Sequence, residues 1–232
     1  MQQLDTLEFI FYHIPKCGGT SIREYFKQLF IMKQINNRDI YIAGDTIHKP
    51  NIMEASHLEL FMTKYVTSKI LLAHINNDFY NKLNGKFTIT CVRNPIHRAI
   101  SSFNHFVLTD DPHANIESLY KKHQLRTIIN NCYTCATWLR SNLNDYNFIM
   151  VFENLEPDLS TVSNMLNVKN LPYVPHLDPA IKNKECNPNI FKFNFNITLH
   201  KKIFNAMKDI LAKDIVIYNN ICLMRKLDHL VI

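Results

Sequence analysis

The segment FIFYHIPKCGGTSIREYF, residues 9–26, decides the fold because it joins an apolar run, a tight glycine turn and a helical pattern. Residues 8–13 are short and rich in β-forming side chains, which predicts a buried strand. From Thr20 onward a helix is predicted, because apolar residues recur at the 3.6-residue spacing at Ile22, Tyr25, Phe26, Leu29 and Phe30. A strand, a turn and a helix N-terminus together make an anion site, since the first N–H groups of a helix lack partners within it and the helix dipole favours negative charge.

The turn carries the side chains that a phosphate-bearing ligand requires. Only 4 glycines occur in the chain, and Gly18 and Gly19 are two of them, placed where the backbone has to approach a ligand. Thr20 and Ser21 add hydroxyl donors, and Lys16 adds a mobile positive charge. No lysine follows the glycines directly, so the Walker pattern of ordinary ATP and GTP sites is absent. A glycine turn that only caps a helix is the alternative for this segment.

The rest of the chain alternates between strands and helices. Three further strands are predicted at 69–74, 87–93 and 147–152. Helices are predicted at 57–65, from Asn94 to about Leu108, over 114–141 with a break near Asn130, at 159–166, and twice within 198–226. Residues 167–196 are rich in Asn and Pro and predict a long surface loop. We expect one α/β domain over 1–232, with a mostly parallel central sheet flanked by helices.

A second segment, CVRNPIHRAISSFNHF at residues 91–106, predicts another anion site. Asn94 and Pro95 mark a helix start, with asparagine as N-cap and proline in the first turn. Arg93 precedes that start, and Ser101 follows Asn94 by two helical turns on the same face. An arginine and a serine placed this way predict the binding of a second phosphate, with Arg93 bidentate. A structural arginine beside a surface serine is the alternative.

Composition indicates the charge of the ligand and the cellular location of the protein. The net charge is +6 and the pI is near 8.9, which favours an anionic ligand. The basic residues are scattered rather than gathered in a stripe, so we expect no nucleic-acid partner. No run approaches the ~20 apolar residues of a membrane span and the start lacks a secretory pattern, so a cytoplasmic protein is expected. The 6 cysteines are expected to be reduced.

The motifs HIPKCGGTS and VRNPIHRAISSF resemble those of the carbohydrate-type sulfotransferases, similar to the heparan and chondroitin enzymes and their bacterial relatives. That family carries H-[IV]-P-K-[TC]-[GA]-G-T-S followed by R-[DN]-P-x-x-R-x-x-S. Looser matches are LLAHINNDFY at 71–80, YNFIMVFENLEPDL at 146–159 and LAKDIVIYN at 211–219. The resemblance implies a P-loop-like nucleotide-binding fold and a sulfotransferase activity.

The resemblance also implies a donor and a set of site residues. The donor is 3′-phosphoadenosine-5′-phosphosulfate (PAPS), whose 5′-phosphosulfate binds the first motif at Lys16, Cys17, Gly18, Gly19, Thr20 and Ser21. Its 3′-phosphate binds the second motif through Arg93 and Ser101. The catalytic base implied is His74, although Ala73 replaces the glycine that often precedes this histidine in the family. Lys16 stabilises the leaving phosphate, and the acceptor is a hydroxyl group, expected on a carbohydrate.

Several alternatives stay open from the residues alone. Other candidates for the base are His105, His48, His113, His176 and the carboxylate of Glu153, while His13 is expected to be structural. Cys132 and Cys135 form half of a zinc pattern without a second pair, so no metal is expected. A P-loop-type nucleotide kinase and a non-enzymatic glycan-binding module on the same fold are the competing functions.

Overall fold

The computed structural model describes residues 9–32, 40–42, 70–73, 87–107, 115–131, 139, 142–168 and 191–232. These residues divide between two compact units. The sheet unit comprises Met1–Cys91, Leu139–Met150 and Asn154–Pro175, and the helical unit comprises Val92–Trp138, Val151–Glu153 and His176–Ile232. The expectation of one domain over 1–232 stays a prediction.

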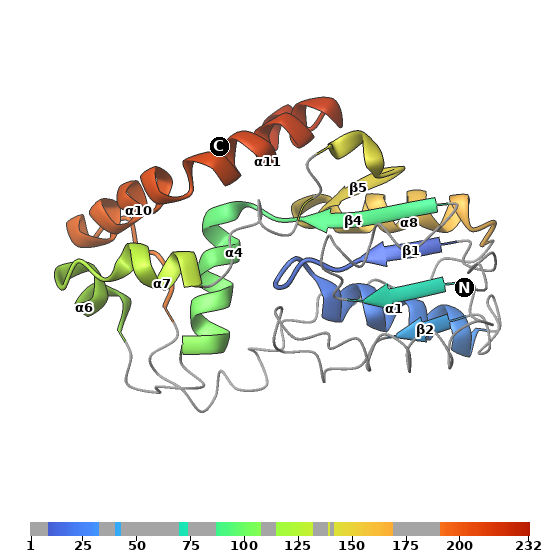
Figure 1. Cartoon of the computed structure of the whole chain (residues 1–232), viewed down its shortest axis with the longest axis horizontal. Coiled ribbons are helices and arrows are strands. Elements are labelled where there is room, and N and C mark those ends of the chain that lie inside the picture. Colours follow the sequence, from blue (N-terminus) through green and yellow to red (C-terminus); the bar gives the residue numbers. More distant parts are fainter. Residues whose placement is uncertain are drawn as a thin grey trace, which may run out of the picture. The chain divides into compact units, whose positions relative to one another are not determined.

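A five-stranded sheet forms the centre of the sheet unit, in the order β2-β3-β1-β4-β5. Its strands are β1 (Phe9–Tyr12), β2 (Ile40–Ile42), β3 (Ile70–Ala73), β4 (Phe87–Val92) and β5 (Phe148–Val151). β1 pairs in parallel with both β3 and β4, and β2 pairs in parallel with β3 (Figure 1). The predicted mostly parallel sheet flanked by helices is therefore confirmed, with β2 as a strand that sequence reasoning missed.

The glycine turn follows β1 at the carboxyl edge of the sheet, where the neighbouring strands β3 and β4 also end. Tyr12 is paired with Ala73 on one side and with Thr90 on the other. The Thr90 hydroxyl also donates to the Tyr12 carbonyl at 2.8 Å, which fixes the last residue of β1. Ligands of open α/β sheets bind outside this carboxyl edge, and the turn after β1 lies at that edge.

Two helices of the sheet unit pack against each other. They are α1 (Gly19–Ile31) and α8 (Leu155–Met165), and the Tyr25 and Ser163 hydroxyls lie 2.6 Å apart between them. All four residues of β1 are buried, as expected of a strand covered on both faces. The apolar stripe predicted for α1 is buried at Ile22, Tyr25, Phe26 and Leu29.

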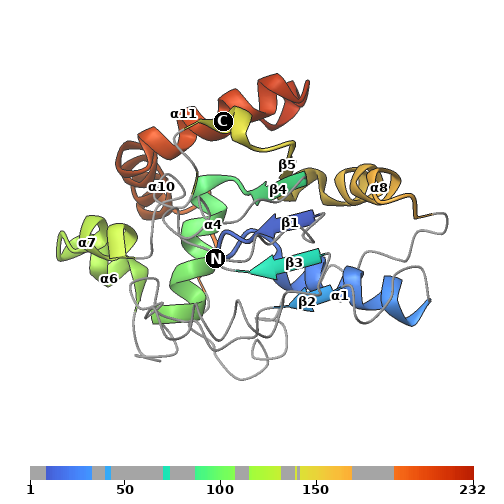
Figure 2. The ribbon, with the colours of Figure 1, turned by 45° about the vertical axis from the view of Figure 1, so that its right-hand side comes forward.

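The helical unit has its own core. Its helices are α4 (Pro95–Ser102), α6 (Ile116–Lys121), α7 (Leu125–Asn131), α10 (Thr198–Ile210) and α11 (Ala212–Met224). α10 contacts the other four, and its neighbours are seen around it in Figures 1 and 2. The shared core consists of Ile96, Ala99, Phe103, Ile116, Leu125, Ile129, Phe191, Ile203, Met207, Leu211 and Ile215.

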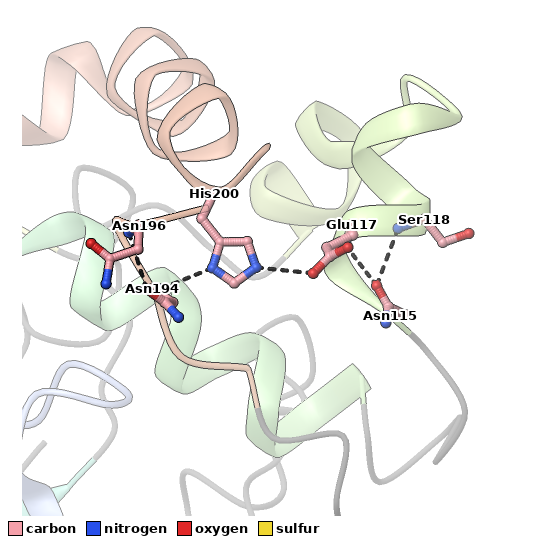
Figure 3. Close-up of polar contacts among 6 residues, drawn as sticks. All are labelled: Asn115, Glu117, Ser118, Asn194, Asn196 and His200. Carbon is pink, nitrogen blue, oxygen red and sulfur yellow. Dashed lines mark hydrogen bonds and ion pairs between the residues drawn. The ribbon is translucent and has the colours of Figure 1, made fainter. Parts of the chain in front are cut away.

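A buried histidine fastens the segment that leads into α10 (Figure 3). The Asn194 N–H donates to His200 Nδ1 at 2.8 Å, and His200 Nε2 lies 2.9 Å from a Glu117 carboxylate oxygen on α6. Since Nδ1 accepts a hydrogen bond, the proton of the neutral ring is assigned to Nε2 and points to Glu117. The Asn104 side chain clamps the same segment by bonding both the N–H and the carbonyl of Phe191, each at 3.1 Å.

Several predicted boundaries need correction. The helical stretch 114–141 breaks earlier than predicted, because His123 takes a positive φ of 56° between α6 and α7. α8 begins at Leu155, four residues before the predicted start. By contrast, the helix predicted from Asn94 to about Leu108 has the expected extent, because α4 is followed directly by a π-helix, η2 (Phe103–Val107). Two predicted segments, 57–65 and most of 167–196, lie outside the described residues.

Among the helices in the described part of the chain, none combines the length and apolar character of a membrane span. Within those same residues, no cluster of three or more His, Cys, Asp or Glu side chains suits a metal ion. Among the described residues, Cys17, Cys91 and Cys222 are buried free cysteines. Cys132 and Cys135 lie outside the described residues.

Candidate active site

A reverse turn connects β1 to the glycines. The Cys17 N–H donates to the Ile14 carbonyl at 3.2 Å, which places Pro15 and Lys16 in the two central positions. Lys16 has a φ of 65°, so the turn is of the type that requires a left-handed residue in its third position. A lysine there costs on the order of 1 kcal/mol relative to glycine, and strain of this kind gathers at functional sites. The backbone therefore holds the only lysine of this turn in a defined, unfavourable conformation.

The next residues start α1. Gly18 has a φ of 83°, and its carbonyl accepts the first helical hydrogen bond from the Ile22 N–H at 3.0 Å. The N–H groups that follow Gly18 consequently have no i−4 partner inside the helix and form its positive end. Thr20 is half-buried, whereas Ser21 is 1% exposed. The turn thus leads directly into a helix N-terminus, with Thr20 as the more accessible of the two hydroxyls.

Position 19 requires a glycine because of a neighbouring histidine, and not because of its own backbone conformation. A Cβ built on Gly19 would lie 1.8 Å from His13 Nε2 and 1.9 Å from Cε1, so the imidazole occupies the space of a side chain. The His13 ring in turn stacks on Phe11, with centroids 5.7 Å apart. The His13 ring therefore packs between Phe11 and Gly19. The Cys17 thiol is fully buried, so its contribution to a ligand is limited to the backbone.

The second motif lies in the helical unit and follows the sequence prediction closely. The Asn94 side chain accepts the N–H groups of Ile96 at 3.1 Å and His97 at 3.2 Å, and Pro95 begins α4. Immediately before this cap, the Arg93 guanidinium carbon lies 4.5 Å from the centroid of the Phe152 ring. A cation over an aromatic face is attracted by the ring and restricted in orientation. Ser101, the other residue predicted here, is half-buried on α4.

The Glu153 carboxylate connects the short helix that follows β5 to the start of α4 and to α11. Glu153 belongs to the short helix η5 (Phe152–Asn154), and its Oε1 accepts the Asn94 N–H at 3.0 Å. Its Oε2 accepts the Tyr218 hydroxyl of α11 at 3.1 Å. Burial and, secondly, the charge of Glu153 raise the pKa of Tyr218, so its phenol stays a donor. His97 Nδ1 lies 3.9 Å from Glu153 Oε1, and that imidazole is 59% exposed.

The predicted residues are therefore found in two groups. Lys16, Cys17, Gly18, Gly19, Thr20 and Ser21 form the turn of the sheet unit, and Arg93 and Ser101 belong to the helical unit. His74 follows the last residue of β3 in the sequence but lies outside the described residues. His105 is exposed on η2. Sequence reasoning missed Phe152 and Tyr218 as partners of the second motif, since only their distances identify them.

Comparison with known proteins identifies one family. The model of the Sulfotransferase family matches residues 3–140, which contain both motifs. No curated protein matches this chain. A crystal structure of a sulfotransferase from Alicyclobacillus acidocaldarius is 14% identical, with a TM-score of 0.49, and the match covers 96% of each chain. Mouse sulfotransferase SULT7A1 complexed with PAP is 15% identical, with a TM-score of 0.47, over 92% of this chain and 86% of that one.

Proposed function

The chain belongs to the sulfotransferase family, and from that premise we propose that it transfers a sulfuryl group from PAPS to a hydroxyl group of a carbohydrate. The enzyme class and a hydroxyl-bearing acceptor follow from the family. The observation that carries the proposal of a phosphosulfate donor is the turn after β1. There Lys16, in a strained backbone conformation, precedes the N-terminus of α1. The Gly18 carbonyl accepts the first hydrogen bond of that helix.

The residues present suit the phosphate groups of such a donor. A 5′-phosphosulfate is anionic, and the N–H groups at the start of α1 together with Thr20 supply donors from one short segment. The 3′-phosphate is assigned to Arg93 and Ser101. Arginine suits this group because its planar fork bonds two phosphate oxygens at once. The ring of Phe152 restricts the orientation of that fork.

The donor, when bound, supplies the sulfuryl group whose bond to the bridging phosphate oxygen is broken. In our proposal the chain's own groups do three things. His74 accepts the proton of the acceptor hydroxyl, because an imidazole titrates near neutral pH. Lys16 places its ammonium group by the bridging oxygen and stabilises the negative charge that grows there. The helix N-terminus holds the 5′-phosphate, so that the acceptor oxygen is in line with the bond that breaks.

The test is calorimetric titration with adenosine 3′,5′-bisphosphate, with and without Mg²⁺, and with ATP for comparison. We expect tight binding of the bisphosphate that does not depend on the metal, and little binding of ATP. A preference for Mg·ATP would instead support a kinase. Release of the bisphosphate from PAPS in the presence of hydroxyl-bearing sugars then tests turnover. Binding without turnover on any acceptor would favour the glycan-binding module.

The base is tested separately. His74→Ala should lower kcat by about 10²-fold or more while leaving the affinity for the bisphosphate within about twofold, since a general base contributes roughly 10²–10⁴. His229→Ala is the matched control, because His229 is exposed on the short helix η6 (Asp228–Leu230) and is not among the candidates for the base. A loss of kcat in the control that equals the loss in His74→Ala would remove His74 from the mechanism.

A further inference from the structure

We propose that Glu153, held by Tyr218, is a positioning residue that fixes the Arg93–Asn94 segment for phosphate recognition, and that it is not the base of the reaction. The inference rests on the proposed function, in which Arg93 binds the 3′-phosphate of the donor. All the residues involved belong to the helical unit. Sequence reasoning left Glu153 open as a carboxylate base, and its contacts assign it the other role.

The first observation is that two consecutive residues of η5 hold two consecutive residues of the second motif. The Phe152 ring lies 4.5 Å from the Arg93 guanidinium carbon. The next residue, Glu153, accepts the Asn94 N–H at 3.0 Å. The ring restricts the plane of the guanidinium, while the carboxylate fixes the peptide unit that follows Arg93. One short segment therefore constrains both the side chain and the backbone of this arginine.

The second observation is that the Glu153 carboxylate is itself held on its other oxygen. The Tyr218 hydroxyl donates to Oε2 at 3.1 Å, and Tyr218 is 2% exposed. A buried phenol on α11 has few conformations open to it, so it restricts the rotation of the carboxylate. Burial also raises the pKa of Tyr218, which keeps the donor protonated. The C-terminal helix α11 is thereby connected to the backbone beside Arg93.

The third observation separates positioning from proton transfer. Both carboxylate oxygens accept bonds from groups of the protein, and the side chain is 19% exposed. The negative charge of Glu153 also lies next to a segment that binds a phosphate, where a like charge weakens the binding of an anion. A neutral side chain with one acceptor oxygen would keep the bond to Asn94 and remove that repulsion. Glutamine is such a side chain, so Glu153→Gln distinguishes the two roles.

The experiment compares Glu153→Ala, Glu153→Gln and Tyr218→Phe with Glu156→Ala, an exposed glutamate in the first turn of α8. For each, calorimetry gives the affinities for adenosine 3′,5′-bisphosphate and for adenosine 5′-monophosphate, and kinetics with PAPS give kcat and KM. Thermal melting verifies that each variant folds. The ratio of the two affinities measures recognition of the 3′-phosphate.

We expect Glu153→Ala to weaken binding of the bisphosphate by about tenfold and binding of the monophosphate by less than about twofold, as the loss of a charged hydrogen-bond partner implies. Tyr218→Phe should show the same selective loss at about threefold. Glu153→Gln and Glu156→Ala should bind the bisphosphate as tightly as the wild type or, for Gln, more tightly, with kcat retained. In an Arg93→Ala background, Glu153→Ala should cause no further loss, because it acts through Arg93.

Two results would overturn the positioning role. One is a fall in kcat of about 10²-fold or more in Glu153→Gln with unchanged nucleotide affinity, which would identify Glu153 as the base. The other is an unchanged affinity ratio in Glu153→Ala or, if that variant does not fold, in Tyr218→Phe. Failure of the proposed function is recognised differently: the wild type itself would bind the two nucleotides equally well, so that Arg93 reads no 3′-phosphate.

Discussion

Replacing Gly19 by alanine should destabilise the protein through a single clash that a second substitution relieves. The added Cβ would lie 1.8 Å from His13 Nε2, 1.9 Å from Cε1 and 2.6 Å from Cδ2. Ordinary contacts between such atoms are about 3.5–4.0 Å, so the ring has to retreat by well over an ångström. The ring stacks on Phe11, which is 2% exposed, and this neighbour resists that movement.

The expected magnitude follows from overpacking. Inserting a methyl group into a well-packed site typically costs about 1–3 kcal/mol, and we expect about 2 kcal/mol for Gly19→Ala. In a chain of 232 residues this corresponds to a melting temperature lower by about 4–8 °C. In a His13→Ala background the clash is absent. Because the φ of Gly19 is not left-handed, alanine there should then be neutral or stabilising by up to about 1 kcal/mol.

The assay is a double-mutant cycle, in which chemical unfolding gives the stabilities of the wild type, both single variants and the double variant. The two substitutions should be coupled by about 2 kcal/mol or more. Gly18→Ala is the matched control: with a φ of 83° at Gly18, its cost of about 1–2 kcal/mol comes from the backbone and should be the same in both backgrounds. An equal cost of Gly19→Ala with and without His13 would refute the packing role of this histidine.

Three further predictions concern charge. Lys16→Ala and Lys16→Gly should both lower turnover by about 10²-fold or more, but Lys16→Gly should be the more stable of the two because φ is 65°; unchanged turnover in both would exclude the leaving-group role. Arg93→Ala should lower the affinity for adenosine 3′,5′-bisphosphate, measured by calorimetry, far more than the affinity for adenosine 5′-monophosphate. Equal losses of affinity would show that Arg93 does not bind the 3′-phosphate. The pKa of Tyr218 is raised above its ordinary 10.0 by burial and by Glu153, so the unfolded chain loses this proton first as the pH rises. The unfolding free energy of the wild type should therefore fall more steeply than that of Tyr218→Phe above about pH 10, and equal slopes would contradict the shift.

Much of the fold could be predicted because its signals are local. The apolar runs that became β1, β3, β4 and β5 are short and contain β-forming residues. The start of α4 was also predictable, because an asparagine cap followed by proline requires only neighbouring residues. β2 was missed since its three residues, Ile40–Ile42, are too few to form a pattern. The break at His123 was missed because a positive φ in a non-glycine residue has no strong sequence signal.

The candidate site also combines residues that local motifs predict with contacts that only the structure shows. The motifs identified Lys16, the glycines and Arg93 as candidate phosphate-binding residues, because an anion-binding turn is built from consecutive residues. By themselves they did not show that His13 packs against Gly19, nor that Glu153 accepts a hydrogen bond from the Asn94 N–H. Glu153 lies 59 positions from Asn94 and 65 from Tyr218 in the sequence.

The sequence by itself therefore determined the family, the alternation of strands and helices, and the two segments that carry positive charge to the ends of β1 and β4. Each of these depends on residues within a few positions of one another, where backbone geometry and hydrogen bonding act directly. Only the tertiary structure decided which side chains hold those segments in place. The partners of Arg93, Asn94 and Gly19 are selected by packing, which brings together residues that no local pattern connects.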